Sequence, residues 1–329
     1  MRHTHQAIIL SAVLATFQAT AAGSAGSQSY PTRPITMIVP YPAGGPTDTL
    51  ARVMSEPLKN RLGQSVIIEN VTGAGGSIGT GRVARAEPDG HTIAIGHNQT
   101  HVINGAILNL QYDVVKDFEP VTLIAETPIW IIAKKSLPAN DIKELVAWLK
   151  QPDTKANVGA VGIGGPGDIA AISFQRDTGT KFPFVIYRGG APLLQDLLSG
   201  QIDFTFGQAA TYLPHVRSGA LKAYAVLMPR RWWAAPEVPT LDELGIKGIY
   251  AGFWHGIWVP KGTPAPIVAT LNGAFKTTLA DAATQKRFKD IGQEIFPVEQ
   301  QTPAALAAQQ KTEIERWWPV IKAAGIKSE

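Results

Sequence analysis

Cysteine is absent from the 329 residues of the chain. This absence excludes disulfides, thiolate metal sites and a lipid attached to a cysteine behind a leader, so the core alone must stabilise the fold. Long hydrophobic runs are missing too, because no segment approaches the roughly 18 unbroken apolar residues that a membrane helix needs. We therefore expect a soluble protein.

An excess of one charge is also lacking. Lys and Arg total 30 and Asp and Glu total 26, which gives a formal net charge of +4, and the charges are dispersed along the chain. This balance lacks the basic footprint of nucleic-acid binding, so we expect no nucleic-acid partner. The hydrophobic content of 45% and charged content of 17% are ordinary for a globular protein and supply apolar mass for about two domains.

The first residues have a composition of their own. A short basic head precedes the apolar residues 7–17, and small residues follow, with Ala19 and Ala21 at the spacing of a cleavage site. This order is typical of a secretory signal peptide, and the apolar stretch is too short to span a bilayer. We expect residues 1–25 to be a signal peptide and the mature protein to be exported to the periplasm.

The first part of the chain alternates strand and helix patterns. ITMIV at residues 35–39 is typical of a buried strand, and residues 49–62 carry apolar side chains at helical spacing, with Pro57 expected to kink the helix. Further strands are predicted at 65–70 and 91–96, with a glycine-rich loop and a short helix between them. Repeated strand, loop and helix units predict an α/β fold with a largely parallel sheet.

A second α/β unit follows a break marked by Pro138 and Asn140. Residues 253–264 are expected to form a strand that returns to the first unit. Two lobes joined by crossing strands enclose a cleft, and ligands of open α/β sheets bind beyond the carboxyl ends of the strands. The other predicted elements are strands at 157–162, 182–187, 202–207 and 221–228, and helices from 169, around 191–200 and 211–219, and at 265–279 and 304–322.

A glycine loop, PYPAGGPTD, joins the first strand to its helix. Free backbone N–H groups and the helix dipole favour an anion at such a helix start, and Gly44 and Gly45 would let it approach. The alternative is a plain turn capped by Thr47 or Asp48. No Gly-Lys-Ser/Thr follows, which excludes a Walker phosphate loop, so we predict a carboxylate site.

A second glycine loop, GIGGPG at residues 162–167, matches the dinucleotide fingerprint G-x-G-x-x-G. That fold also needs an acid at the end of the next strand, where this chain has Tyr187 and Arg188. Arg188 would suit the 2′-phosphate of NADP, but an exported protein that retains NADP would be unusual. We therefore interpret the loop as a second anion site that faces the first.

Two further motifs allow other functions. GGSIG at residues 75–79 matches G-x-S-x-G, so an exported serine hydrolase that uses Ser77 is an alternative, although five residues separate Glu69 from Gly75 where a nucleophile elbow needs a sharp turn. His97 and His101 are four apart, but no third ligand has metal-site spacing, so hydrogen-bonded histidines are favoured. The paired tryptophans of RRWW and ERWW are interpreted as structural. We expect no metal, no cofactor and no catalytic residue.

The whole chain from 30 to 327 resembles the substrate-binding proteins of tripartite tricarboxylate transporters, the family first named for Bordetella uptake genes. The resemblance implies a periplasmic-binding-protein-like fold of type II, a Venus flytrap of two α/β lobes joined by crossing hinge strands. It also implies no catalysis, and capture of a carboxylate by backbone amides and ordered water in two loops, residues 41–48 and 162–168. The stretches that carry the resemblance are YPTRPITMIVPYPAGGPTD, LGQSVIIENVTGAGGSIGTGRVARAEPDG, THVIN, YDVVKDFEPVTLI, YRGGAPLLQDLLSGQIDF, RRWWAAPEVPTLDELG and PKGTPAPIVATLN.

Two departures from the family pattern concern the ligand. The usual Ser-x-x-His of the second loop is replaced by Gly165 and Asp168, and Asp168 either caps its own helix or accepts a hydrogen bond from a ligand hydroxyl or amine. The small residues usual before THVIN are replaced by His97, Asn98 and Gln99. The candidate ligand-binding residues are Tyr41, Ala43, Gly44, Gly45, Thr47, Asp48, His97, Asn98, Gly162, Ile163, Gly164, Gly165, Asp168, Arg188 and Gln208.

The resemblance implies a monomeric periplasmic receptor that captures a small organic carboxylate and delivers it to the large and small membrane subunits of a secondary transporter. One lobe is predicted to comprise residues 26–128 and 254–329, and the other residues 129–253. Aliphatic, hydroxylated, amino and aromatic acids all remain open as ligands.

Overall fold

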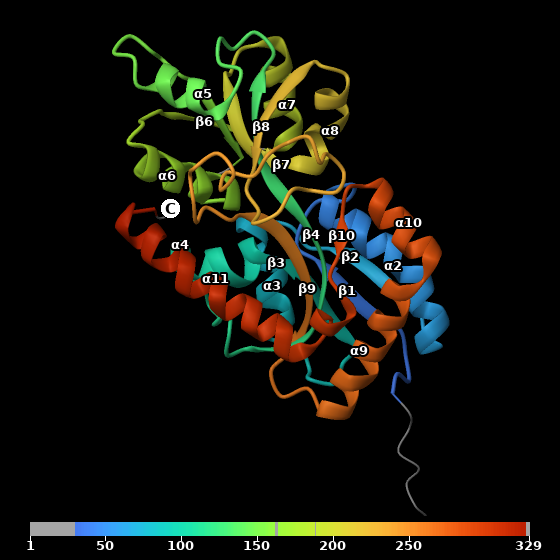
Figure 1. Cartoon of the computed structure of the whole chain (residues 1–329). Coiled ribbons are helices and arrows are strands. Elements are labelled where there is room, and N and C mark those ends of the chain that lie inside the picture. Colours follow the sequence, from blue (N-terminus) through green and yellow to red (C-terminus); the bar gives the residue numbers. More distant parts are fainter. Residues whose placement is uncertain (1–29, 162–163, 188, 327–329) are drawn as a thin grey trace, which may run out of the picture.

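The computed structural model describes residues 30–161, 164–187 and 189–326. The predicted signal peptide and three candidate site residues, Gly162, Ile163 and Arg188, lie outside them. Figure 1 shows two α/β lobes, one above the other. We call the lobe of β1 (Ile35–Val39), β2 (Val66–Asn70) and β3 (Thr92–His97) the first lobe, and that of β5 (Val158–Val161), β6 (Phe184–Tyr187), β7 (Phe204–Gln208) and β8 (Leu221–Val226) the second lobe.

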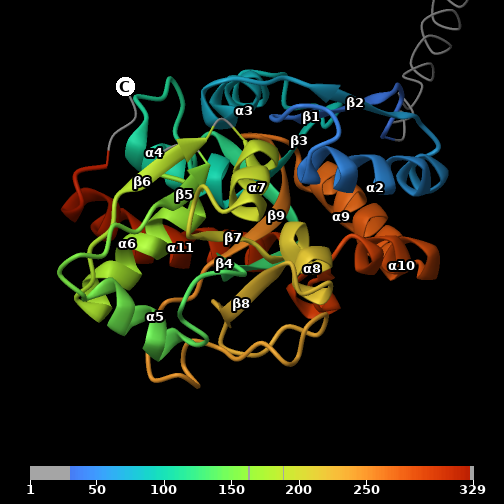
Figure 2. The same cartoon turned by 90° about the horizontal axis from the view of Figure 1, so that it is seen from above.

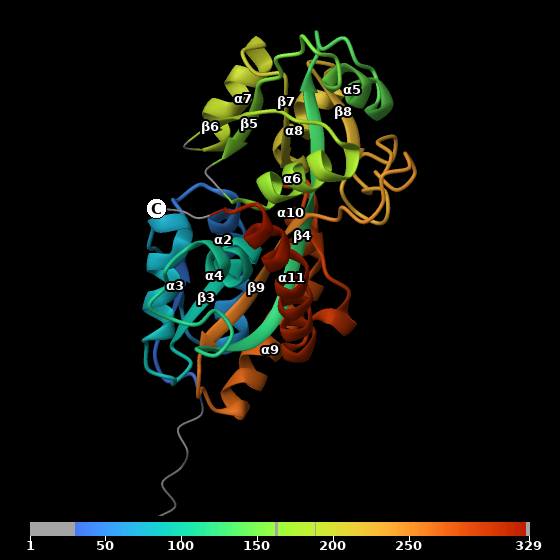
Figure 3. The same ribbon diagram turned by 90° about the vertical axis from the view of Figure 1, so that its left-hand side faces the viewer.

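Two strands join the lobes. The 17-residue β4 (Phe118–Lys134) extends through both lobes, with β9 (Gly252–Pro260) beside its first half (Figure 3). Within β4 the partner changes between Pro128, which pairs with Gly252 of β9, and Ile129, which pairs with Gln208 of β7. The strand order is β2-β1-β3-β9-β4-β7-β5-β6, and β8 and β10 (Glu294–Ile295) also pair with β4.

The prediction of a largely parallel sheet holds only for the outer strands of each lobe. β1 is parallel to β2 and β3, and β5 is parallel to β6 and β7. The pairs that involve β4 or β9 are antiparallel, because the chain crosses between the lobes in opposite directions in these two strands.

Helices cover both faces of the sheet in the first lobe (Figure 2). Successive residues of β1 point to opposite faces of the sheet, as the two-residue period of a strand requires. Ile35, Met37 and Val39 join a core with α2 and α9, whereas Ile38 joins the core on the other face. The helices of the first face are α2 (Pro46–Leu62), α9 (Ala265–Ala280) and α10 (Ala282–Asp290), and those of the second are α3 (Ser77–Ala84), α4 (Asn104–Ile107) and α11 (Pro303–Ala323).

The second lobe is built in the same way. Ile131 of β4 packs in one core with Phe174 and Phe204, and Trp130 packs in the other with Leu193 and Trp232. The helices of the first face are α5 (Ile142–Leu149) and α6 (Pro166–Thr178), and those of the second are α7 (Gly190–Ser199) and α8 (Ala209–Arg217).

Two sequence-based expectations about helices were incomplete. α2 continues through Pro57 to Leu62, the predicted end of the helix, so the proline does not end it. Met54 and Leu58 on either side of the proline are fully buried, and this packing outweighs the loss of one hydrogen bond. The sequence did not predict α4, α5 or α10. Among the described residues, no helix has both the length and the apolarity to cross a bilayer.

Candidate ligand-binding site

The first glycine loop places a helix N-terminus directly after the carboxyl end of β1. Gly45 is the N-cap of α2, with φ −74° and ψ 169°, and Pro46 occupies the first helical position, where its missing N–H costs nothing. The N–H of Thr49 is the first to bond within the helix, to the Gly45 carbonyl at 2.9 Å. The N–H groups of Thr47 and Asp48 therefore have no acceptor in the helix and are suited to an anion.

Asp48 is not the N-cap that the sequence suggested, and neither is Thr47. Asp48 is the third helical residue, and its carboxylate accepts a hydrogen bond of 2.8 Å from the N–H of Gly44. Gly44 has φ +82°, a conformation that suits glycine. The loop amide of Gly44 is thus occupied by the loop's own acid.

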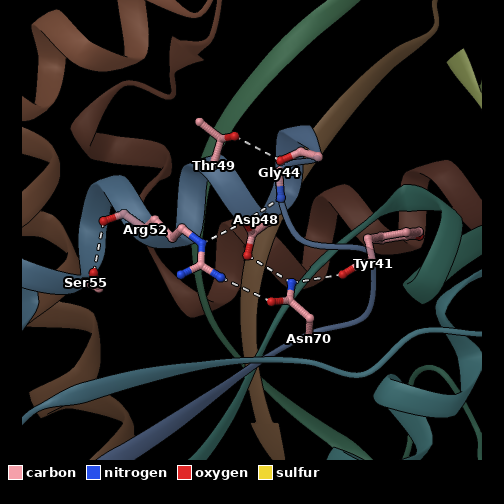
Figure 4. A network of polar contacts seen from close by, with 8 residues as sticks. Tyr41, Gly44, Asp48, Thr49, Arg52, Ser55 and Asn70 are labelled. Atoms are coloured by element: carbon pink, nitrogen blue, oxygen red, sulfur yellow. Dashed lines mark hydrogen bonds and ion pairs between the residues drawn. The ribbon is translucent and has the colours of Figure 1, made fainter. Parts of the chain in front are cut away.

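Asp48 is the centre of a polar network (Figure 4). Its side chain is 1% exposed, accepts hydrogen bonds from Arg52 Nε at 2.8 Å and from Asn70 Nδ2 at 2.9 Å, and forms an ion pair with Arg52. Burial raises the pKa of Asp48, but the hydrogen bonds from Arg52, Gly44 and Asn70 outweigh it and lower the pKa to about 2. Asn70 also donates to the Tyr41 carbonyl at 3.0 Å, which ties the end of β2 to the loop.

The second glycine loop repeats the first in sequence and in backbone. Gly164 has φ +79°, and Gly165 is the N-cap of α6 with φ −70° and ψ 164°. The carboxylate of Asp168 accepts a hydrogen bond from Gly165 N–H at 3.1 Å. The shared motif is Gly-Gly-Pro-x-Asp, at residues 44–48 and 164–168. Sequence reasoning found both stretches but missed this repeat, which was the available signal that the loops form a pair.

The two acids differ in their surroundings. Arg52 follows Asp48 by four residues and neutralises it, whereas Ile172 stands at the same distance after Asp168. Burial raises the pKa of Asp168 to about 7, although hydrogen bonds from Gly165 and Gly164 lower it in part. No ion pair of the described residues includes Asp168. Within the described ranges, which leave out Arg188, the acid of the second loop has no counter-ion.

The second loop contacts the first lobe. A Cβ on Gly164 would lie 3.0 Å from Ile107 Cδ1 and 3.4 Å from Ile326 Cγ2, and a Cβ on Gly165 would lie 3.8 Å from Gln99 Oε1. Gly167 lies against the Phe206 carbonyl of β7, where a side chain would collide. Gly167 is therefore required where the first loop has Thr47.

The end of β3 packs against the first loop. The ring of His97 stacks on that of Tyr41 with centroids 4.7 Å apart, and its Nδ1 accepts a hydrogen bond from Gln99 N–H at 3.0 Å. His255 approaches His97 edge-on at 5.4 Å and lies 3.1 Å from Thr47 Oγ1. Burial lowers the pKa of His97 to about 4 and also lowers that of His255, so both rings are neutral at neutral pH.

Asn98 and Gln208 lie where the lobes join. Asn98 is 2% exposed and donates to the Gly252 carbonyl at 2.7 Å, and its Oδ1 is buried with no partner among the residues that the structure describes. Gln208 is half-buried at the end of β7 and pairs with Ile129. Ala43 is exposed in the first loop.

Two further motifs lie beside this arrangement, and Tyr41 Oη donates a hydrogen bond of 3.4 Å to the Gly75 carbonyl of GGSIG. His101 is fully buried, stacks on Trp258 at 3.7 Å and has a pKa lowered by burial to about 3, so it forms no metal pair with His97. Ser77 is the first residue of α3, and within the described ranges it makes no hydrogen bond to a histidine or an acid. The same part of the chain contains no group of three residues suited to a metal ion.

Two surface hollows lie on the first lobe. One of about 370 Å³ lies against the first loop and is lined by Ala43, Gly44, Asp48, Thr49, Arg52, Val53 and Arg287. The other, of about 470 Å³, is lined by α9, α10 and β10 and contains none of the candidate site residues.

The chain is similar to known proteins over nearly its whole length. The profile described as tripartite tricarboxylate transporter family receptor matches residues 50–326. A protein encoded in the TAR-I ttuE–ttuC′ intergenic region of Agrobacterium vitis is 38% identical over 319 residues, 97% of this chain and 91% of that protein.

Solved structures extend the similarity to the fold. The periplasmic binding protein BugD is 38% identical with a TM-score of 0.79, and the match covers 91% of this chain and 100% of that one. MatC from Rhodopseudomonas palustris, solved with bound malate, is 37% identical with a TM-score of 0.79, and the match covers 89% and 100%. These similarities confirm the predicted class of fold, a two-lobed periplasmic binding protein.

Proposed function

The chain belongs to the tripartite tricarboxylate transporter receptor family, and from this premise we propose that it is a periplasmic receptor that captures an organic carboxylate and delivers it to the membrane subunits of a tripartite transporter. The observation that carries the proposal is the pair of Gly-Gly-Pro-x-Asp helix starts, one in each lobe. MatC, a structural neighbour, was solved with malate, a small carboxylate.

The helix N-termini supply the affinity for the carboxylate. The N–H groups of Thr47 and Asp48 at the start of α2, and those of Gly167 and Asp168 at the start of α6, have no acceptor within their helices. Hydrogen bonds from such amides to a carboxylate are charge-assisted and roughly twice as strong as neutral ones. Because Arg52 already neutralises Asp48, the first loop offers these donors without a net negative charge.

Closure of the two lobes over the ligand follows from the crossing strands. We place the boundary in β4 between Pro128 and Ile129, where the strand changes partner from β9 to β7. We propose the division predicted from the sequence, with residues 26–128 and 254–329 in one lobe and 129–253 in the other. Side chains at the end of β3, His97 and Asn98, and Gln208 on β7 then select the ligand.

The test is a thermal-shift screen of carboxylic acids, each paired with its methyl ester. An acid at 100 times its dissociation constant should add about 2.7 kcal/mol to the free energy of unfolding. Its ester should add almost nothing, because it lacks the charge that the amides recognise. An ester that stabilises the protein as well as its acid would show that the loops do not hold a carboxylate.

A receptor also differs from the serine hydrolase alternative in a simple assay. Ser77 should not react with a fluorophosphonate, and Ser77→Ala should bind ligand as the wild type does. Specific labelling of Ser77, together with turnover of an ester, would favour the hydrolase.

A further inference from the structure

We propose that residues 230–233 form an inter-lobe clasp, which holds the two lobes in the arrangement in which the second glycine loop contacts the first lobe. These residues, Arg-Arg-Trp-Trp, come shortly after β8 of the second lobe. They contact the corner between α10 and β10 in the first lobe. The inference goes beyond the proposed function, because it concerns how the lobes are held together, and it rests on three contacts.

The first contact is an ion pair between Arg230 and Glu294 of β10. Two nitrogens of the guanidinium donate to the two carboxylate oxygens, at 2.9 and 3.2 Å, and Nη2 also lies 3.5 Å from Oε1 of Glu126. Two parallel hydrogen bonds to a carboxylate are charge-assisted and fix the orientation of the arginine. One side chain that follows β8 thus reaches two acids of the first lobe.

The two acids depend on this arginine. Glu126 on β4 and Glu294 on β10 stand directly opposite each other in an antiparallel pair, with side chains only 22% and 26% exposed. Like charges at opposite positions of a sheet are destabilising. Burial, and then the charge of Glu294, raises the pKa of Glu126 to about 7, although Arg230 lowers it in part. Withdrawal of Arg230 would leave two carboxylates facing each other, so separation of the lobes at this point is unfavourable.

The second contact is a glycine that lies against the core of the second lobe. Gly292, in the turn between α10 and β10, has φ +69°, and a Cβ there would lie 2.8 Å from Ala210 Cβ and 3.3 Å from Trp232 Cη2. Trp232 is fully buried and packs edge-on against Trp130 of β4, with ring centroids 5.4 Å apart. A side chain at residue 292 would therefore push the two lobes apart.

The third contact joins Trp233 to α10. Lys289 Nζ lies 5.2 Å from the centroid of a Trp233 ring, within the range of a cation–π interaction. Residues 230, 232 and 233 thus contact residues 294, 292 and 289, in reverse order along the chain. The three contacts therefore form one continuous interface between two short segments.

The inter-lobe clasp is connected to the candidate site through α10. Figure 1 shows α10 beside α2, and the two helices are in contact. The first glycine loop leads into α2, and Arg287 of α10 lines the hollow beside Gly44. On the other side of the cleft, the second loop lies against the first lobe, where Gly164 approaches Ile107. The corner that the clasp holds thus adjoins the helix that carries the first loop.

The experiment measures the distance between the lobes in the unliganded protein. Because the chain has no cysteine, Asn60→Cys on α2 and Lys143→Cys on α5 give two unique sites for spin labels. Both positions are exposed. Pulsed electron paramagnetic resonance should give one narrow distance distribution for this labelled parent. Arg230→Gln in the same background should broaden the distribution and add distances that the parent lacks, because the lobes lose their ionic connection.

The neighbouring Arg231 provides the matched control. Its ion pair with Glu243, at 3.0 Å, is similarly exposed, but both residues belong to the chain between β8 and β9. Arg231→Gln should therefore leave the distance distribution unchanged. Arg230→Lys keeps the charge and should stay close to the parent. Exchange of the charges, by Arg230→Glu with Glu294→Arg, should reverse most of the broadening.

Urea unfolding of each labelled variant checks the fold. Exposed ion pairs contribute little to stability, so Arg230→Gln should unfold at nearly the same urea concentration as the parent. Should Arg230→Gln fail to fold, Glu294→Gln breaks the same ion pair and should also broaden the distribution.

The variants separate an ionic clasp from a local effect. A folded Arg230→Gln variant with the parental distribution, or equal broadening in Arg231→Gln, would overturn the inference. Broadening in Arg230→Gln that appears equally in Arg230→Lys and in the charge exchange would show that the charge is not what holds the lobes, and would overturn it too. None of these measurements uses a ligand, so their failure would leave the proposed function intact.

Discussion

The backbone N–H of Gly44 donates a hydrogen bond of 2.8 Å to the carboxylate of Asp48, four residues further along the chain. This bond holds the glycine loop against the first turn of α2. It also removes one amide from those that a ligand can use. The amides left for an anion are those of Thr47 and Asp48, within the helix itself.

Replacement of Gly44 by valine should weaken both the fold and ligand binding. Gly44 has φ +82°, and no atom lies within 4 Å of the point that a Cβ would occupy, so the cost comes from the backbone conformation, at about 1–2 kcal/mol. Gly44→Asn should cost less, because asparagine tolerates this conformation. Urea unfolding and calorimetry measure the two effects.

Gly63 provides the matched control. It caps the far end of α2 with φ +69° and equally open space. Gly63→Val should lower stability by a similar amount and leave ligand affinity unchanged. Equal losses of affinity in Gly44→Val and Gly63→Val would remove the first loop from the site.

Asp48→Ala should lower the free energy of unfolding by about 1–3 kcal/mol, because it removes the charged acceptor of the Gly44 N–H and one of the two acceptors of Asn70 Nδ2. The effect should depend on pH. The folded pKa of about 2 is below the usual 3.8, so the stabilisation is complete above pH 4 and is lost as the pH falls towards 2. Denaturant unfolding should show that the free energies of unfolding of the wild type and of Asp48→Ala converge between pH 4 and 2. A difference that stays constant over this range would contradict the prediction.

Asp168 should have the opposite pH dependence in the unliganded protein. Its folded pKa of about 7 is above the usual 3.8, so the folded state binds the proton more tightly and stability falls as the pH rises from about 4 to 7. Asp168→Asn does not titrate, so the wild type should lose stability relative to this variant across that range. If the melting temperatures of the wild type and of Asp168→Asn changed equally with pH, the carboxyl of Asp168 would not destabilise the folded state in this range, and the prediction would be contradicted.

The buried histidines should make the protein sensitive to acid. The pKa of His101 is lowered by burial to about 3 and that of His97 to about 4, from 6.5, so the unfolded state takes up more protons and stability falls as the pH drops from 6.5 towards 4. His101→Phe keeps the stacking on Trp258 and should lose less stability over this interval, after a cost of about 1 kcal/mol at neutral pH. Calorimetric scans at several pH values measure how steeply the stability of the wild type and of His101→Phe falls with pH. Equal slopes for the two proteins would show that His101 does not titrate in this interval.

The sequence determined most of the local structure. Short apolar runs predicted β1, β2, β3 and the strands of the second lobe, but not the long central strand β4. Helical spacing identified α9 and α11 within two residues at each end, whereas α2 begins at Pro46, three residues before its predicted start at 49. The return of β9 to the first lobe was also predicted and observed.

Local patterns failed where packing competes with propensity. Pro57 is unfavourable inside a helix, yet α2 continues because Met54 and Leu58 are buried on both sides of it. Thr47 and Asp48 are good N-caps by residue type, but the backbone of Gly45 takes that position and leaves the acid free to reach Gly44. The first outcome depends on packing against other elements, whereas the second rests on a hydrogen bond between residues only four apart in the chain.

At the candidate site, too, the sequence identified some features and only the tertiary structure decided others. The sequence identified both glycine loops and the acid at Asp168, because each is a short motif. Only the tertiary structure decided that His97 stacks on Tyr41 and that Gln99 of one lobe faces Gly165 of the other. Such contacts join residues far apart in the chain, and they are selected by the packing of two lobes and not by the order of neighbouring residues.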